Sequence, residues 1–119
     1  MELIEKVLSC ESGNKEHIHL FLQKGVWHAF DNSAYLLSQT QENVKPELCL
    51  FKDYSIWLVK TTLSEELQDF ICSKLSVLKQ SSTHIVLCAK NICQKESLSE
   101  WMSLIKKRNL STVESPLYT

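Results

Sequence analysis

The chain has 119 residues, with 13 basic against 14 acidic side chains and a formal net charge of −1. This length fits one domain with its own core, and 44% hydrophobic with 23% charged residues is typical of a globular protein. A nearly neutral chain has no overall attraction to nucleic acid or anionic membrane, so either partner requires a local patch. No apolar run approaches the roughly 18 residues that cross a bilayer, and we expect no membrane association.

Five cysteines are scattered along the chain, and no two of them form a CxxC pair. The N-terminal segment MELIEKVLSC is charged and typical of a helix, unlike a secretory signal. We therefore expect reduced cysteines and a cytoplasmic location. His84, Cys88 and Cys93 are conceivable zinc ligands. On a strand, however, residues four apart are separated by about 13 Å, so we expect no metal site and no cofactor.

The first thirty residues predict a helix followed by a β-hairpin. Residues 1–12 carry apolar side chains at three- and four-residue spacing, which favours an amphipathic helix. Alternating residue types over 17–23 predict a strand, and 26–30 predicts its returning partner. Lys24 and Gly25 are expected to form the turn, because glycine admits the positive φ that a tight hairpin requires.

A second helix and a second hairpin are expected next. One residue of 31–33 (Asp-Asn-Ser) is expected to cap a helix over 33–39 by accepting a hydrogen bond from its free amides. Residues 41–46 are polar and end in a proline, which indicates a loop. The segment 47–61 is rich in aliphatic and aromatic residues and predicts two strands joined at 52–54.

The remainder predicts a helix, a strand and a last helix. Residues 83–90 are short, β-branched and apolar, which favours a central strand buried on both faces. Residues 95–108 predict the last helix, and its basic end complements the helix dipole. The helix of this series precedes both elements in the chain and is expected to begin at Thr62 or Ser64. One face of it carries an apolar stripe, formed by Leu67, Phe70, Ile71, Leu75 and Leu78.

These elements follow the order α-β-β-α-β-β-α-β-α, with no repeat and no linker between them. The economical arrangement is an α/β (α+β) fold in which a single mixed sheet of about five strands is flanked by helices. We expect one domain over residues 1–110 and a loose C-terminal tail over 111–119.

Residues 20–37, LFLQKGVWHAFDNSAYLL, resemble the N-terminal mismatch-recognition domain of the DNA mismatch-repair protein MutS. The resemblance extends over roughly Ile18 to Lys90 and implies the fold given above. In that family a Phe wedges against the mismatched base and a Glu two residues later hydrogen-bonds to it. Val26 and His28 occupy these positions here, with Trp27 between them. Valine has no π face for stacking and histidine is not an acidic acceptor, so mismatch repair itself is not expected.

The same stretch is also similar to small single-domain proteins of Bacteroides-type bacteria that share a W-x-A-[YF]-[ED]-x-S-A core. This resemblance supports the fold and adds little about function. The residues that match that core are Trp27, Ala29, Phe30, Asp31, Ser33 and Ala34.

Two interpretations of the hairpin remain open. Its Lys24, Val26, Trp27 and His28 form a candidate edge for nucleic acid or a protein partner, because indole stacks on bases and on partner surfaces. The structural alternative, which we favour, is that the aromatic side chains pack into the core. Alternation places Val26 and His28 on one face, and Trp27 on the other.

His17, His19 and His28 form a second candidate group, because three neighbouring histidines can bind a metal or titrate together. The same pattern is also typical of the solvated face of an antiparallel pair, which we favour.

We therefore expect a non-enzymatic domain, without catalytic residues, that binds nucleic acid or a protein. The alternatives are a small enzyme or metal-binding protein that uses the first-hairpin histidines, and a homodimer subunit that pairs through a sheet edge.

Overall fold

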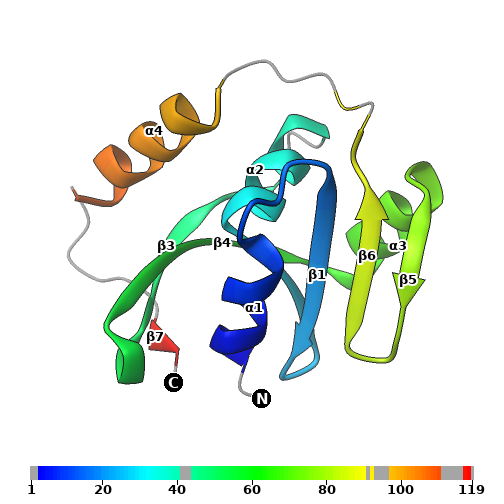
Figure 1. The fold of residues 1–119 in the computed structure, drawn as a ribbon, viewed down its shortest axis with the longest axis horizontal. Helices are drawn as coiled ribbons and strands as arrows, with labels where there is room; N and C mark the ends of the chain where they lie inside the picture. The colour runs from blue at the N-terminus through cyan, green and yellow to red at the C-terminus, as the bar shows by residue number, and fades with distance from the viewer. Residues whose placement is uncertain (1–2, 41–43, 91, 93–96, 111–116, 119) are drawn as a thin grey trace.

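The computed structural model describes residues 3–40, 44–90, 92, 97–110 and 117–118 (Figure 1). Within these residues the chain forms helices and strands in an alternating order that confirms the predicted mixed class. The helices are α1 (Leu3–Glu11), α2 (Asp31–Thr40), α3 (Glu65–Lys74) and α4 (Leu98–Leu110), with a short 3-10 turn, η1 (Lys52–Tyr54). The strands are β1 (His17–Gln23), β2 (Val26–Phe30), β3 (Glu47–Phe51), β4 (Ile56–Leu63), β5 (Val77–Gln80), β6 (His84–Cys88) and β7 (Leu117–Tyr118).

All seven strands belong to one sheet, in the order β5-β6-β1-β2-β4-β3-β7. The first six pair in antiparallel fashion, and β7 adds to β3 in parallel. β1 lies inside the sheet: it pairs with β2 through Phe21 opposite His28, and with β6 through Phe21 opposite His84. Because directly opposed residues of antiparallel strands project to the same side, these pairs fix which side chains share a face.

Helices cover both faces of the sheet, and each face has its own core. In Figure 1, α1 lies in front of the sheet and α3 lies behind β5 and β6. The α1 face carries a smaller, aromatic cluster formed by Ile4, Val7, Phe21, Phe30, Cys49, Phe51 and Leu58. The opposite face, here the α2 face, carries the larger cluster, in which α2, α3 and α4 pack on Ile18, Leu20, Ala29, Val59, Leu63, Ile85 and Leu87.

The first hairpin has the predicted geometry. Lys24 and Gly25 both have positive φ, at 52° and 77°, the two-residue turn that matches the twist of a hairpin. β2 then bends into α2 at Asp31, whose φ is 44°. The Asp31 carboxylate accepts the amide of Val59 at 3.0 Å, and so pairs a donor of β4 at the point where β2 leaves the sheet.

Two predictions in the second half need correction. The helix that Ser64 caps ends at Lys74, and the stripe residue Leu78 belongs to the edge strand β5 instead. Leu75 already has extended backbone angles, because the chain there turns back to pair with β6. β6 is not buried on both faces: Ile85 and Leu87 are buried, whereas His84, Val86 and Cys88, which alternate with them, are half-buried. Within the described ranges the sheet thus has seven strands, against about five predicted.

The predicted tail at 111–119 lies mostly outside the described residues, and Leu117 and Tyr118 within it form β7. Among the helices that the structure describes, none is long and apolar enough to cross a membrane.

Candidate functional site

All four histidines lie on the α1 face of the sheet. Phe21 belongs to the α1 cluster, so its strand neighbours His17 and His19 project to the same side. His28 and His84 are the two residues directly opposite Phe21, and they therefore share this face. The register of three strands thus gathers histidines that are up to 67 positions apart in the sequence.

Two of these histidines and one cysteine form a compact cluster beneath α1. His19 Nδ1 and His84 Nε2 are 3.1 Å apart. The Cys10 thiol, from the last turn of α1, completes a group whose three ligand atoms all lie within 4.8 Å of one another. All three side chains are half-buried, so the cluster is shielded but reaches solvent.

Aromatic packing orients the two imidazoles. The Phe21 ring stacks on His84 with a centroid distance of 4.6 Å and an interplanar angle of 9°. The rings of His19 and His84 are 5.3 Å apart and inclined by 23°. This packing restricts the rotation of both rings and fixes the position of His19 Nδ1 relative to His84 Nε2.

A buried carboxylate fixes the end of α1 against the strand that carries His19. The carboxylate of Glu11 accepts the Ser33 amide at 2.8 Å and the Ser33 hydroxyl at 2.6 Å. The hydroxyl oxygen of Ser33 in turn accepts the backbone amide of His19 at 2.8 Å. Glu11 therefore supplies the cap of α2 that was expected from residues 31–33, and the same bonds tie Cys10 and His19 to one anchor.

Protonation states at neutral pH suit metal binding. Burial, followed by the charges of His84 and His17, lowers the pKa of His19 to about 4. Burial, followed by the charges of Lys6 and Lys79, also lowers the pKa of His84. Both imidazoles are therefore neutral at pH 7, and each has a lone pair for a hydrogen bond or a metal. Burial raises the pKa of the Cys10 thiol, so a metal must displace its proton on binding.

The donor geometry is close to that of a tetrahedral zinc site. Zn–N bonds of about 2.0–2.1 Å at a tetrahedral angle place two imidazole nitrogens about 3.3 Å apart, and His19 and His84 lie at 3.1 Å. A Zn–S bond of about 2.3 Å places the sulfur about 3.5 Å from each nitrogen. The Cys10 thiol lies within 4.8 Å of a ring nitrogen of each histidine, so it would have to move closer by about 1 Å to reach that distance.

The hairpin residues singled out in the sequence do not form one surface. Lys24 is exposed at the turn, and Val26 is half-buried on the α1 face. Trp27 packs against the larger core on the α2 face, opposite Leu63. His28 is buried and lies 3.3 Å from the hydroxyl of Thr62. The alternation predicted for this strand is confirmed, and it separates the indole from its neighbours.

The histidine trio of the first hairpin is only partly brought together. His17 and His19 are adjacent, with ring centroids 6.2 Å apart, whereas the buried His28 is no member of the cluster. Cys10 is not among the metal ligands expected from the sequence. His84 is expected there only with Cys88 and Cys93, of which Cys93 lies outside the described residues. The spacing on β6 carried no signal for the cluster, because the partners of His84 lie on β1 and α1.

No family model, curated protein or solved structure matches the chain. The resemblance to the MutS domain and nucleic-acid binding by the hairpin therefore stay predictions. A gel shift with single-stranded and duplex DNA, repeated with Trp27→Ala, tests the latter.

Proposed function

We propose that this chain is a small, non-enzymatic binding domain in which Cys10, His19 and His84 hold one zinc ion. The observation that carries the proposal is the 3.1 Å approach of two neutral imidazole nitrogens next to a thiol, in a place where packing fixes both rings. This modifies the metal-binding alternative drawn from the first hairpin, of which only His19 is retained.

The donor set favours a borderline or soft transition metal over a hard cation. Two imidazoles and a thiolate match the ligands of zinc, whereas Mg²⁺ and Ca²⁺ prefer oxygen donors. The alternative use of the histidine pair is a plain N–H···N hydrogen bond, with one imidazole as donor and the other as acceptor. The Cys10 thiol distinguishes the two uses, because a histidine hydrogen bond does not require it.

Cobalt substitution tests the proposal directly. We expect the reduced chain to bind one Co²⁺ with a thiolate-to-cobalt charge-transfer band and a tetrahedral visible spectrum, and zinc to displace it. Cys10→Ser should abolish the charge-transfer band, and His19→Gln or His84→Gln should weaken metal binding by more than about 100-fold, since even outer-shell partners contribute 10- to 100-fold.

Cys88→Ser is the matched control, because Cys88 is a half-buried thiol on the same strand as His84 and outside the cluster. Its spectrum should equal that of the native chain. Absence of a charge-transfer band in the native chain, or its persistence in Cys10→Ser, overturns the proposal.

A second candidate function is self-association through β5. This strand pairs with β6 on one side only, within the part of the chain that the structure describes. Val77 and Leu78 are 41% and 54% exposed, and Phe70 of the neighbouring α3 is 46% exposed. An open strand edge beside apolar side chains readily pairs with a second copy. Light scattering tests this: we expect a dimer that Leu78→Lys converts to a monomer, and a monomeric native chain at high concentration refutes it.

A further inference from the structure

The cluster provides three donors, and a tetrahedral zinc ion takes four. Among the described residues, the group around Cys10, His19 and His84 contains no further histidine, cysteine or carboxylate. The neighbouring His17 lies 6.2 Å from His19 between ring centroids. Three protein donors with one free position is the arrangement in which zinc binds an exogenous ligand. Resting on the zinc site proposed above, we infer that this fourth position takes a phosphate-type oxyanion held by Lys6 and Lys79.

Lys6 lies on the side of α1 that faces the cluster. It precedes Cys10 by one helical turn, and side chains four residues apart lie on the same helix face. Its ammonium group is 5.8 Å from the centroid of the Phe21 ring. The same ring stacks on His84 at 4.6 Å, so the ammonium and the His84 imidazole share Phe21 as a neighbour.

Lys79 lies on the edge strand β5, on the α1 face of the sheet. β6 lies between β5 and β1, and its Val86 is directly opposite both Lys79 and His19. Lys79 therefore projects to the same face of the sheet as His19 and His84. Both lysines act on the cluster: their positive charges add to burial in lowering the pKa of His84, and they oppose the rise that burial causes in the pKa of Cys10.

The charge balance at the fourth position favours an anion over water. A zinc ion with one thiolate has a net charge of +1, and the two ammonium groups raise the local total to +3. Two acidic side chains of α1 bear on this balance. Glu11, which binds Ser33, follows Cys10 directly, and its negative charge offsets part of this total; Glu5 accepts the hydroxyl of Tyr54. A dianionic oxyanion such as phosphate gains more from this field than a monoanionic carboxylate.

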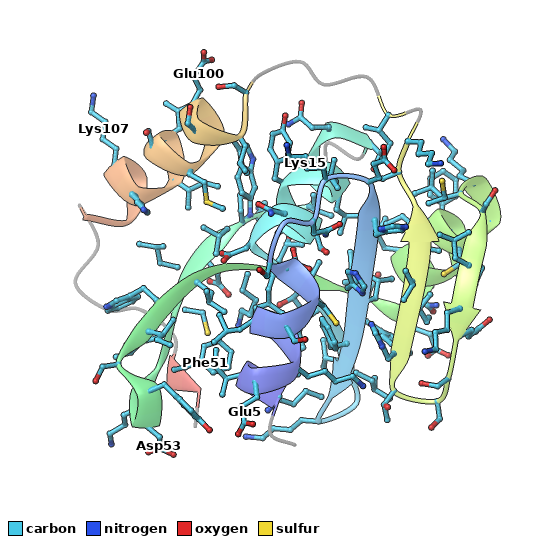
Figure 2. All side chains as sticks on the ribbon, in the orientation of Figure 1. Glu5, Lys15, Phe51, Asp53, Glu100 and Lys107 are labelled. Carbon is cyan, nitrogen blue, oxygen red and sulfur yellow. The ribbon has the colours of Figure 1, made fainter. Side chains whose placement is uncertain are left out.

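The test uses the cobalt-loaded chain and inorganic phosphate, followed by the visible cobalt spectrum. We expect a saturable change with one phosphate per cobalt, and weaker binding of acetate. Lys6→Gln and Lys79→Gln should each weaken phosphate binding by about three- to fivefold, the range for partly exposed charge pairs, and retain cobalt. Lys107→Gln is the control, because Lys107 projects from α4, away from the sheet (Figure 2). It should leave phosphate binding unchanged.

Each other outcome overturns the inference in a distinguishable way. A cobalt-loaded chain whose spectrum ignores phosphate refutes the anion and leaves the zinc site standing. A spectrum that ignores phosphate but changes in His17→Gln identifies His17 as the fourth ligand. Equal affinity for acetate and phosphate, or full phosphate affinity in both lysine variants, refutes the role of the lysines. Failure to bind cobalt at all refutes the zinc site together with the inference.

Discussion

The carboxyl group of Glu11 is expected to make stability depend on pH in the direction opposite to the histidines. Burial raises its pKa to about 7 in the folded chain, although hydrogen bonds from Ser33 and Asn14 oppose the rise. In the unfolded chain the group titrates near its ordinary value of 4.5. Between these values the folded state holds a proton that the unfolded state has released. The stability that protonation of Glu11 contributes to the folded chain is therefore fully present below about pH 4.5 and is lost as the pH rises through about 7.

The size of this effect follows from the two pKa values. At about 1.4 kcal/mol for each pH unit, the interval from 4.5 to about 7 corresponds to about 3 kcal/mol of unfolding free energy. Only 6% of Glu11 is exposed, so screening by solvent reduces this free energy little. His19 acts in the other direction: its lowered pKa of about 4 gives a contribution that is present above 6.5 and lost as the pH falls. In the native chain the two effects oppose each other between about pH 4 and 7.

Glu11→Gln separates them, because glutamine keeps an acceptor for the Ser33 amide and does not titrate. Urea unfolding of the metal-free chain, measured from pH 4 to pH 8, gives the free energy of unfolding of each variant. We expect the free energy of unfolding of the native chain, relative to that of the variant, to change by about 3 kcal/mol across this pH range, with the native chain relatively more stable at the acidic end. The exposed Glu16→Gln is the matched control, with a parallel profile. A parallel profile for Glu11→Gln as well refutes the assignment of a raised pKa.

Three further predictions follow from the packing and the turn. Zinc at about 100 times its dissociation constant should add about 2.7 kcal/mol of stability in thermal unfolding, an increment that His84→Gln loses and Cys88→Ser keeps; equal increments in both variants contradict the site. Phe21→Ala should cost about 3–5 kcal/mol in urea unfolding and weaken zinc binding, because the buried ring supports His84; unchanged zinc affinity would show that the ring does not orient the imidazole. Gly25→Ala should cost about 1–2 kcal/mol at its φ of 77° and leave zinc affinity unchanged; no loss of stability would argue against this turn geometry.

The parts of the fold that the sequence predicts are those set by local chemistry. The Lys24-Gly25 turn needs a residue that tolerates positive φ, and Ser64 caps α3 with its own side chain, accepting the Leu67 amide at 3.1 Å. β5 is not predicted from the sequence because it depends on pairing with a distant strand and not on local chemistry. Leu75 and Leu78 continue the helical spacing of α3, but pairing with β6 outweighs that spacing. Propensity over four residues is too weak a signal to reveal such a tertiary contact.

The candidate site was predictable only in part. His19 was among the histidines considered, because alternation along β1 can be inferred from the sequence. The proximity of His84 depends on the register between β1 and β6, and that of Cys10 depends on how α1 crosses the sheet. Neither quantity has a local sequence signature, which is why spacing rules for zinc ligands excluded His84, although the structure places it beside His19 and Cys10.

The placement of the three donors also gives the proposed ion the role of a reversible cross-link. His19 and His84 are 65 positions apart, and Cys10 adds the N-terminal helix to the closed loop. An ion bound at all three positions restricts the unfolded chain over more than half of its length, and removing it restores that freedom. Loop-closure entropy changes by only about 0.6 kcal/mol when a loop doubles in length. Insertions in the segment between β2 and β6 should therefore leave the strength of this cross-link almost unchanged.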